Sequence, residues 1–284
     1  MSYSVLQWLL FFYIYCFIGW CFESAYVSLK KRRFVNRGFL KLPMLPIYGS
    51  GAIAILIVTI PVRDNLWLVW LFGMISATLL ELVTGAVMEL LFKVKYWDYS
   101  HQKFNYKGYI CLSSSIAWGF LSLLLTEVIH EPIESVVLSV PLWLLITLIS
   151  VISVLFVSDF AVSFKAAWDL RRLLEKLTAI RAQASERWDA AKEEASVRWD
   201  AAKEEASERW DAVKEDAAGR LAAIREDYAL KRKDEYLRLS TFRAFFIRRL
   251  LRDNPYAASG KFAEALDELR EDIRRRHEER KKKR

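Results

Sequence analysis

The sequence predicts an all-α protein: a polytopic bundle of about five transmembrane helices, followed by a long cytoplasmic helix of coiled-coil type. The 284 residues are 54% hydrophobic and 27% charged, and both fractions exceed those of an average soluble domain. The charges are segregated along the chain. Residues 1–164 hold 11 Lys or Arg and 9 Asp or Glu, whereas residues 165–284 hold the other 31 and 25. Apolar runs fill the first part, and an eleven-residue repeat fills much of the second.

Five apolar runs follow one another in the first part, each about as long as a helix that crosses ~30 Å of hydrocarbon at 1.5 Å per residue. A large soluble helical protein is the alternative, but five such runs in succession do not fit it. The first run is no cleaved signal peptide, because it lacks a basic start and ends in Lys30–Arg33. The runs are Tyr3–Leu29, Leu42–Val62, Leu66–Phe92, Gly108–Ile129 and Val136–Phe164.

The second run is the weakest of the five. Pro43, Pro46, Gly49 and Gly51 crowd its start. A broken or re-entrant helix is the alternative there, because such backbone is tolerated at membrane depth where protein or water shields it.

Basic residues are concentrated in two of the connecting segments. The segment after the first run has six Lys or Arg and no acid, and the segment after the third has four against Asp98. The alternate connections carry only Arg63 with Asp64, and Glu131 with Glu134. The positive-inside rule therefore predicts a multi-pass protein of the cytoplasmic membrane, with its N-terminus outside and both basic loops and the chain after Phe164 inside.

Three carboxylates lie within the predicted spans, where each charge costs at least ~2.5–3.5 kcal/mol. Glu81 is near the middle of the third run, and Glu89 follows about 80° further round the helix, so both can face one cavity. Glu23 lies near the cytoplasmic end of the first run. No Lys or Arg lies inside a span, so their partners are loop bases such as Arg37, a proton, a metal or a substrate. The alternative is that Glu23 and Glu89 extend to the interface.

The two basic loops add further candidate site residues. The first contains Arg37 among prolines and glycines, which fix turns and allow close backbone approach. The second contains Asp98, Tyr99 and Asn105 among aromatic residues. An ordinary interfacial aromatic belt is the alternative interpretation. The candidate cavity residues are thus Glu23, Arg37, Glu81, Glu89, Asp98, Tyr99 and Asn105.

These segments resemble a bacterial membrane family, the putative type IV ABC-transporter or ABC-transporter permease proteins, over roughly residues 8–130. The family pattern has a glycine before the first proline, and this chain departs from it with Leu42 at that position. The resemblance implies a multispan, permease-like protein and names no substrate. The motifs that carry it are Gly19-Trp20-x-x-Glu23, Asn36–Leu40, Pro46-Ile47-Tyr48-Gly49, Glu81 with Glu89, Trp97-Asp98-Tyr99-Ser100, Asn105, Gly108, Ile110-Cys111-Leu112 and Trp118-Gly119.

Several chemistries have no motif in the sequence. There is no G-x-x-x-x-G-K-[ST] phosphate loop, so transport driven by ATP would need a separate ATPase subunit. The three His are scattered, and Cys16, Cys21 and Cys111 are typical of packing residues. We therefore predict no metal, no cofactor and no enzymatic activity. A membrane-embedded enzyme with Glu81 or Asp98 as acid or base is the weakest alternative.

The charged part carries a literal eleven-residue repeat, Ala-Ser-x-Arg-Trp-Asp-Ala-x-Lys-Glu, three times from Ala184. Its apolar positions follow a 4-3-4 spacing, which is 3.67 residues per turn and favours a straight or slightly right-handed coiled coil. We expect one helix from Ser163 to Tyr228, ~100 Å long. Self-association into a parallel bundle is preferred, and a solitary helix braced by ion pairs is the alternative.

The predicted domains are a transmembrane domain over residues 1–164, a coiled-coil helix over 165–230, and basic amphipathic helices with a charged tail over 231–284. Arg238–Arg252 has five Arg and no acid, a pattern that suits an anionic leaflet or a partner groove. A last helix is expected from Lys261. The basic tail suits binding to anionic lipid or RNA, and the alternative is that it is only a solvated end. Nothing in the sequence resembles a nucleic-acid-binding fold, so nucleic acid is not an expected partner.

Two functions follow. The first is a permease-like protein that moves a small solute or lipid-like substrate through the carboxylate-lined cavity, with the coiled coil for homo-oligomeric assembly. The alternative is a membrane-anchored oligomeric scaffold without transport activity.

Overall fold

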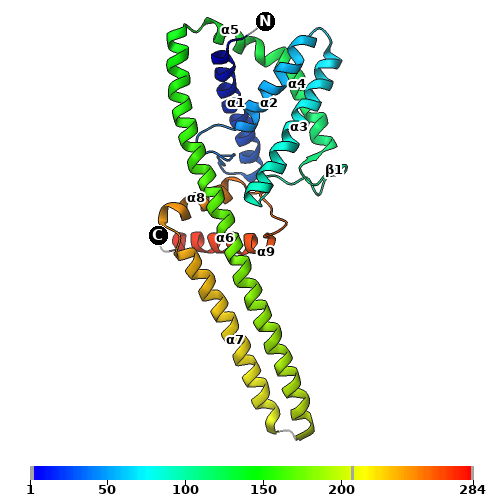
Figure 1. Ribbon diagram of the computed structural model, residues 1–284, viewed down its shortest axis with the longest axis vertical. Helices are drawn as coiled ribbons and strands as arrows, with labels where there is room; N and C mark the ends of the chain where they lie inside the picture. Colours follow the sequence, from blue (N-terminus) through cyan, green and yellow to red (C-terminus); the bar gives the residue numbers. More distant parts are fainter. Residues whose placement is uncertain (1–2, 206–207, 283–284) are drawn as a thin grey trace. The chain divides into compact units, whose positions relative to one another are not determined.

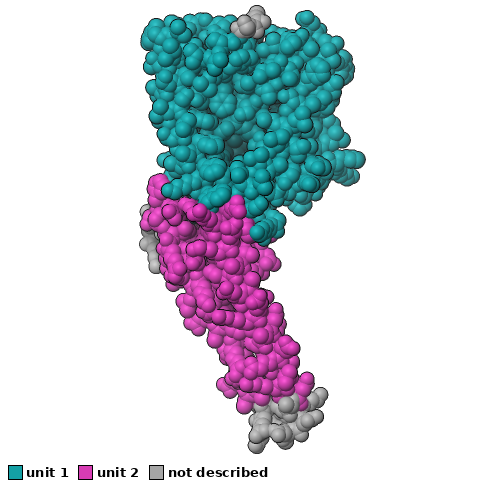
Figure 2. All heavy atoms as spheres, in the orientation of Figure 1, with its two compact units in different colours: residues 1–168, 246–261 teal, residues 169–245, 262–284 magenta. Residues whose placement is uncertain are grey.

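The computed structural model describes residues 3–205 and 208–282, and for residues 201–211 and 276–282 it describes the backbone alone. The chain divides into two compact units (Figure 2). Unit 1 comprises Met1–Trp168 and Phe246–Lys261, and unit 2 comprises Asp169–Phe245 and Phe262–Arg284. A segment close to the end of the sequence is therefore part of the first unit.

Nearly all the secondary structure is helical, which confirms the predicted all-α class (Figure 1). The strands β1 and β2 form a single antiparallel hairpin in which Asn105 is opposite Cys111. Two helices are shared by the units, because α6 begins in unit 1 and α8 ends in it. The elements are α1 (Val5–Lys31), α2 (Pro46–Thr59), the 3-10 helix η1 (Ile60–Val62), α3 (Leu66–Phe92), β1 (Asn105–Tyr106), β2 (Ile110–Cys111), α4 (Leu112–Leu124), the π-helix η2 (Leu125–Ile129), α5 (His130–Ser139), α6 (Leu142–Glu205), α7 (Glu208–Leu237), α8 (Thr241–Asp253) and α9 (Ala263–Lys282).

Four helical stretches among the described residues are long and apolar enough to cross a membrane: Val5–Lys31, Leu66–Phe92, Leu112–Ser139 and the apolar part of Leu142–Asp200. The second apolar run forms a shorter helix, Pro46–Val62. Five spans were predicted, and the run that falls short is the one crowded by proline and glycine. At 1.5 Å per residue that helix is about 25 Å long, slightly less than the hydrocarbon thickness.

The boundary between the fourth and fifth runs lies later than predicted. The helix that starts at Leu112 continues through η2 to Ser139, so Glu131 and Glu134 are helical. Pro141 follows, and Val140 before it has extended backbone, with φ −69° and ψ 122°. Because a residue that precedes proline avoids the α conformation, the chain breaks there and α6 starts afresh at Leu142.

Small residues bring α1 and α2 into close contact. A Cβ atom at Gly19 would overlap the side chain of Tyr48, and one at Gly49 would overlap Cys16 Sγ. Helices in membranes associate through close backbone approach of this kind. Pro46 occupies the first turn of α2, where its missing N–H has no intrahelical partner to lose.

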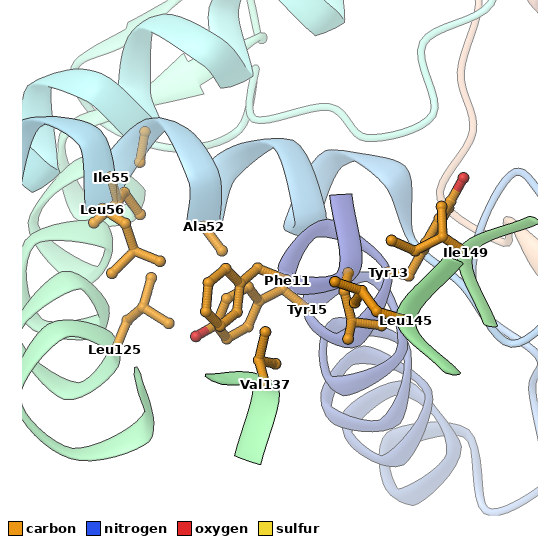
Figure 3. Close-up of a cluster of buried hydrophobic side chains, with 12 residues drawn as sticks. Phe11, Tyr13, Tyr15, Ala52, Ile55, Leu56, Leu125, Val137, Leu145 and Ile149 are labelled. Atoms are coloured by element: carbon orange, nitrogen blue, oxygen red, sulfur yellow. The ribbon is translucent and has the colours of Figure 1, made fainter. Parts of the chain in front are cut away.

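The hydrophobic core of unit 1 lies between α1, α2, η2, α5 and the start of α6 (Figure 3). Phe11 and Leu56 are fully buried in it. Polar groups also enter this core, and among them the Tyr15 hydroxyl is hydrogen-bonded to Nδ1 of His130 at 2.7 Å. The other ring nitrogen of His130 lies 3.0 Å from the Tyr3 hydroxyl, so the buried imidazole is satisfied on both sides.

The segment Phe246–Lys261 packs against the two basic loops of unit 1. Lys95 and Ala258 form a two-bond antiparallel bridge, and the Ser259 hydroxyl donates to the Lys93 carbonyl at 2.6 Å. The guanidinium of Arg249 donates to the Leu40 carbonyl and lies 3.1 Å from Asp253. The apolar face interpreted as a membrane or partner surface is thus largely covered by the chain itself, with Ile247 buried completely.

In unit 2 the eleven-residue repeat forms a hairpin of two antiparallel helices, α6 and α7 (Figure 1). Ion pairs join the two helices, Arg187–Asp227 at 3.0 Å and Arg198–Asp216 at 2.7 Å among them. The expected single helix from Ser163 to Tyr228 is therefore wrong. The apolar positions of the repeat form the packing seam of the predicted helix. Three of these seam positions lie outside the described side chains: Ala202, Ala206 and Trp210.

Most of the apolar positions of the repeat are partly buried in the part of the hairpin whose side chains are described, but Trp199 is 37% exposed. Trp188 and Ala191 on α6, and Val213 and Leu221 on α7, are less exposed than their neighbours. An apolar stripe on one helix buries little alone, and the antiparallel partner supplies the missing contact. The repeat thus packs within one chain, where self-association was expected.

The last helix, α9, begins two residues after the predicted start and is joined to the hairpin by charge. Glu268 on α9 is 2.8 Å from both Arg181 of α6 and Arg232 of α7, and it accepts a bond from Tyr228 at 2.5 Å. Leu266 and Leu269 on the same helix are buried. Unit 2 is therefore a packed helical unit and not an isolated rod.

Candidate functional site

A pocket of about 330 Å³ lies in unit 1 among α1, α2, α3, α4 and the first part of α6. Four of the seven predicted site residues line it: Glu23, Arg37, Glu81 and Tyr99. The loop containing Arg37, the loop containing Tyr99 and the segment 246–261 complete its wall. A second, apolar pocket of about 160 Å³ adjoins it and shares Tyr48, Glu81 and Trp118.

On one side of the pocket Glu23 of α1 forms an ion pair with Arg37. Arg37 Nε lies 3.3 Å from Glu23 Oε1, and the Tyr48 hydroxyl donates to Oε2 at 2.8 Å. The buried guanidinium also donates to Asn254 Oδ1 at 2.8 Å and to the Tyr96 carbonyl at 3.5 Å. The sequence left a loop base such as Arg37, a proton, a metal or a substrate open as partners of these carboxylates, and Glu23 has the loop base Arg37.

On the other side Glu81 projects from the middle of α3 and is 5% exposed. Its Oε1 accepts from the Tyr99 hydroxyl at 3.0 Å, and its Oε2 accepts from Trp118 Nε1 at 2.9 Å. Burial, and then the charge of Glu81, raises the pKa of Tyr99, so the hydroxyl remains a donor. Within the described part of the chain no Lys or Arg lies at ion-pair distance from Glu81, so only neutral donors hold it.

Glu89 does not line this pocket. Its carboxylate accepts from the Tyr109 hydroxyl at 2.6 Å and lies 3.8 Å from Lys95 Nζ. The hydrogen bond to Glu89, followed by burial, raises the pKa of Tyr109 to about 12. The structure thus separates the two carboxylates of α3. Glu89 pairs with a loop base, which agrees with the alternative prediction that it extends to the interface.

Asp98 and Asn105 shape the loop that carries Tyr99. Asp98 Oδ1 accepts from the Ser100 amide at 3.0 Å and from its hydroxyl at 2.5 Å. Burial alone would raise the pKa of Asp98, but these bonds and the charge of Lys95 outweigh it, so the pKa is lowered. Asn105 donates to the Gln102 carbonyl at 2.8 Å and accepts from the Gly108 amide at 3.2 Å.

Seventeen of the 21 residues of the pocket wall were not among the predicted site residues, and these include Tyr48, Tyr96, Trp118 and Asn254. Tyr48 and Trp118 stand inside motifs that carry the family resemblance, so a signal for them was present. Asn254 had none, because Asn254-Pro255 was interpreted only as the end of a helix. It lies 217 positions from Arg37, to which it is bonded.

The long apolar helices indicate a multi-pass helical membrane protein, and a pocket lies among them. The chain belongs to the family described as Putative ABC-transporter type IV, which it matches over residues 10–164. That match ends within the first part of α6 and covers nearly all of the pocket wall. Comparison with the curated proteins and with the solved structures finds no match.

Proposed function

We propose that unit 1 is a permease-like core that moves a small solute through the 330 Å³ pocket, with Glu23 and Glu81 as its polar contacts. The family supports a membrane transporter-like role. Since the sequence contains no phosphate-binding loop, this proposal includes a separate ATPase subunit where ATP supplies the energy. The membrane concerned is the cytoplasmic one, and the basic loops with segment 246–261 mark the cytoplasmic mouth.

The observation that carries the proposal is the position of Glu81. It precedes the end of α3 at Phe92 by eleven residues, which is about 16 Å along the helix axis, and so lies near the middle of the span. A carboxylate at this depth costs a few kcal/mol, and ionisable residues inside spans are associated with solute pathways. Trp118 and Tyr99 orient this carboxylate along the pocket wall, where a solute would meet it.

Transport by purified protein in proteoliposomes tests the proposal. Labelled cationic, neutral and anionic solutes are supplied together, and their uptake is compared with that of protein-free vesicles. We expect at least one class to enter faster, and the Glu81→Gln variant to abolish the difference. Glu89→Gln is the matched control on the same helix and is expected to keep it. No protein-dependent uptake, or full uptake in Glu81→Gln, would count against the role of the pocket.

A membrane-anchored oligomeric scaffold is the second candidate function, favoured by the long hairpin of unit 2. Removing the chain after residue 164 cannot separate the two functions, because that deletion also removes Asn254 from the pocket wall. A better variant replaces residues 185–229 with a short Gly-Ser linker, which shortens α6 and α7 equally. A permease is expected to keep its uptake in this variant, whereas a scaffold loses its assembly, measured by light scattering in detergent.

A further inference from the structure

The 330 Å³ pocket has a wall that is both aromatic and acidic. Nine of its 21 lining residues are Phe, Tyr or Trp, and two are Glu. Aromatic faces attract a cation through the ring quadrupole, and cages of such rings recognise substituted ammonium groups. The pocket therefore has the side-chain chemistry that suits an organic cation.

The charges around the pocket favour the same ligand. The lining contains Glu23, Glu81 and one base, Arg37, so its formal charge is −1. Arg37 donates to Glu23, Asn254 and the Tyr96 carbonyl, which engages three of its five N–H donors, and its charge is paired with that of Glu23. An anionic ligand would thus have to compete with Glu23 for the cation in this wall.

The carboxylates keep hydrogen-bonding capacity that the protein does not use. Arg37 and Tyr48 donate to Glu23, and Tyr99, Trp118 and Ser114 donate to Glu81, so the four carboxylate oxygens accept five bonds from the protein. A carboxylate oxygen can accept two. A ligand that carries positive charge, with or without N–H groups, can therefore lie against both carboxylates without displacing their partners.

Tyr96 also lines the pocket and is 6% exposed. Its hydroxyl oxygen is itself buried, so this residue offers the pocket its aromatic ring and not its hydroxyl.

We propose that the pocket binds a small organic cation of the substituted-ammonium class. The cationic centre lies between Glu23 and Glu81 against the aromatic wall. The adjoining apolar pocket of about 160 Å³ accommodates a short apolar substituent where the ligand has one. This inference rests on the proposed function in that it assigns the substrate class of the same pocket.

Binding to the purified full-length protein in detergent, measured by isothermal titration calorimetry, tests the assignment. Choline is the hydroxylated cation, 3,3-dimethyl-1-butanol is its uncharged isostere, and 3,3-dimethylbutanoate is an anion of similar shape. We expect choline to bind at least about tenfold more tightly than either, which is the scale of cation–π and charge recognition at a desolvated site. Equal or tighter binding of the uncharged or anionic compound would overturn the inference, as would no binding of choline.

Two variants separate ligand contact from a folding defect. Glu81→Gln is expected to weaken choline at least about tenfold, whereas Glu89→Gln, the matched control on the same helix, is expected to leave choline binding unchanged. Equal losses in the two variants would contradict the role of Glu81.

The outcome is distinguishable from failure of the proposed function. Selective binding of choline with no uptake into vesicles would leave the ligand class intact and refute transport. Uptake of an anionic or neutral solute that depends on Glu81 would keep transport and refute the ligand class.

Discussion

Replacing Arg37 with methionine removes the only cation in the pocket wall while keeping most of the apolar volume of the side chain. The side chains of Arg37 and Glu23 are 10% and 25% exposed. Removal of one partner from a buried ion pair costs about 3–5 kcal/mol, because the other charge is left without compensation. Glu23 keeps its bond from Tyr48 and some solvent, so the lower part of that range applies, about 3 kcal/mol.

The lost bond to Asn254 adds about 1 kcal/mol to this figure, since a buried acceptor loses its donor. A domain of this size changes its melting temperature by roughly 2–4 °C per kcal/mol, so we expect Arg37→Met to melt about 8–16 °C below the unmodified chain. Scanning fluorimetry of the purified protein in detergent measures this shift. Arg33→Met, an exposed arginine in the same loop, is the matched control and is expected to change stability by less than about 0.5 kcal/mol.

The double variant Glu23→Gln with Arg37→Met isolates the charge pair. If the loss in Arg37→Met arises from an uncompensated carboxylate, the double variant recovers part of the melting temperature, because no buried charge remains. An Arg37→Met protein as stable as the control, or a double variant that loses the sum of both single changes, would refute the reasoning.

Two further predictions concern helix packing and pH. Gly49→Ala is expected to destabilise the fold by about 1–3 kcal/mol, because the new methyl group overlaps Cys16. Gly51→Ala is the control and is expected to be near neutral, because its methyl group meets only an ordinary contact at 3.6 Å. Thermal melting measures both changes. Ultraviolet titration of the unmodified chain against Tyr109→Phe is expected to assign a phenol near pH 12 to Tyr109, and Glu89→Ala is expected to return it toward 10. Because the folded pKa of Tyr109 lies above its unfolded value, its contribution to stability is complete below about pH 10 and is lost as the pH rises toward 12.

The transmembrane part of the fold was predictable because apolar length is a direct physical requirement of the bilayer. α1 and α3 end within two residues of the predicted limits. The boundary between the last two apolar runs was not predictable. The helix continues through Glu131 and Glu134 because of tertiary contacts, such as the hydrogen bond that Tyr3 donates to Glu134 at 2.5 Å. Charge in the sequence marked a loop there, and packing made it a helix.

The hairpin shows a different limit. The repeat identifies which positions form the seam, and Trp188 and Leu221 follow it. Periodicity is the same whether the partner is a second chain or a later part of the same chain, and no Gly or Pro marks the place where α6 ends. Ion pairs such as Arg198–Asp216 join the two helices, and a sequence pattern alone does not determine their register.

The site was predictable where local chemistry demanded a partner. A carboxylate inside a span requires a donor, which led from Glu23 to Arg37. The separation of Glu81 from Glu89 was not predictable, because about 80° of rotation permits one cavity or two environments. Asn254 could not be predicted as a site residue, since only folding brings it to Arg37.

The most direct test of the account is water access to the pocket beside Glu81. Thr84 lines the pocket, and its neighbour Val83 is exposed on another face of α3. In a chain whose three cysteines are replaced by alanine, Thr84→Cys and Val83→Cys are each treated with a membrane-impermeant trimethylammonium methanethiosulfonate. We predict rapid labelling at position 84, slower labelling by the anionic sulfonate reagent, and none at position 83, which faces lipid. A Thr84→Cys thiol as inert as that of Val83→Cys would contradict a solvated pocket within the bundle.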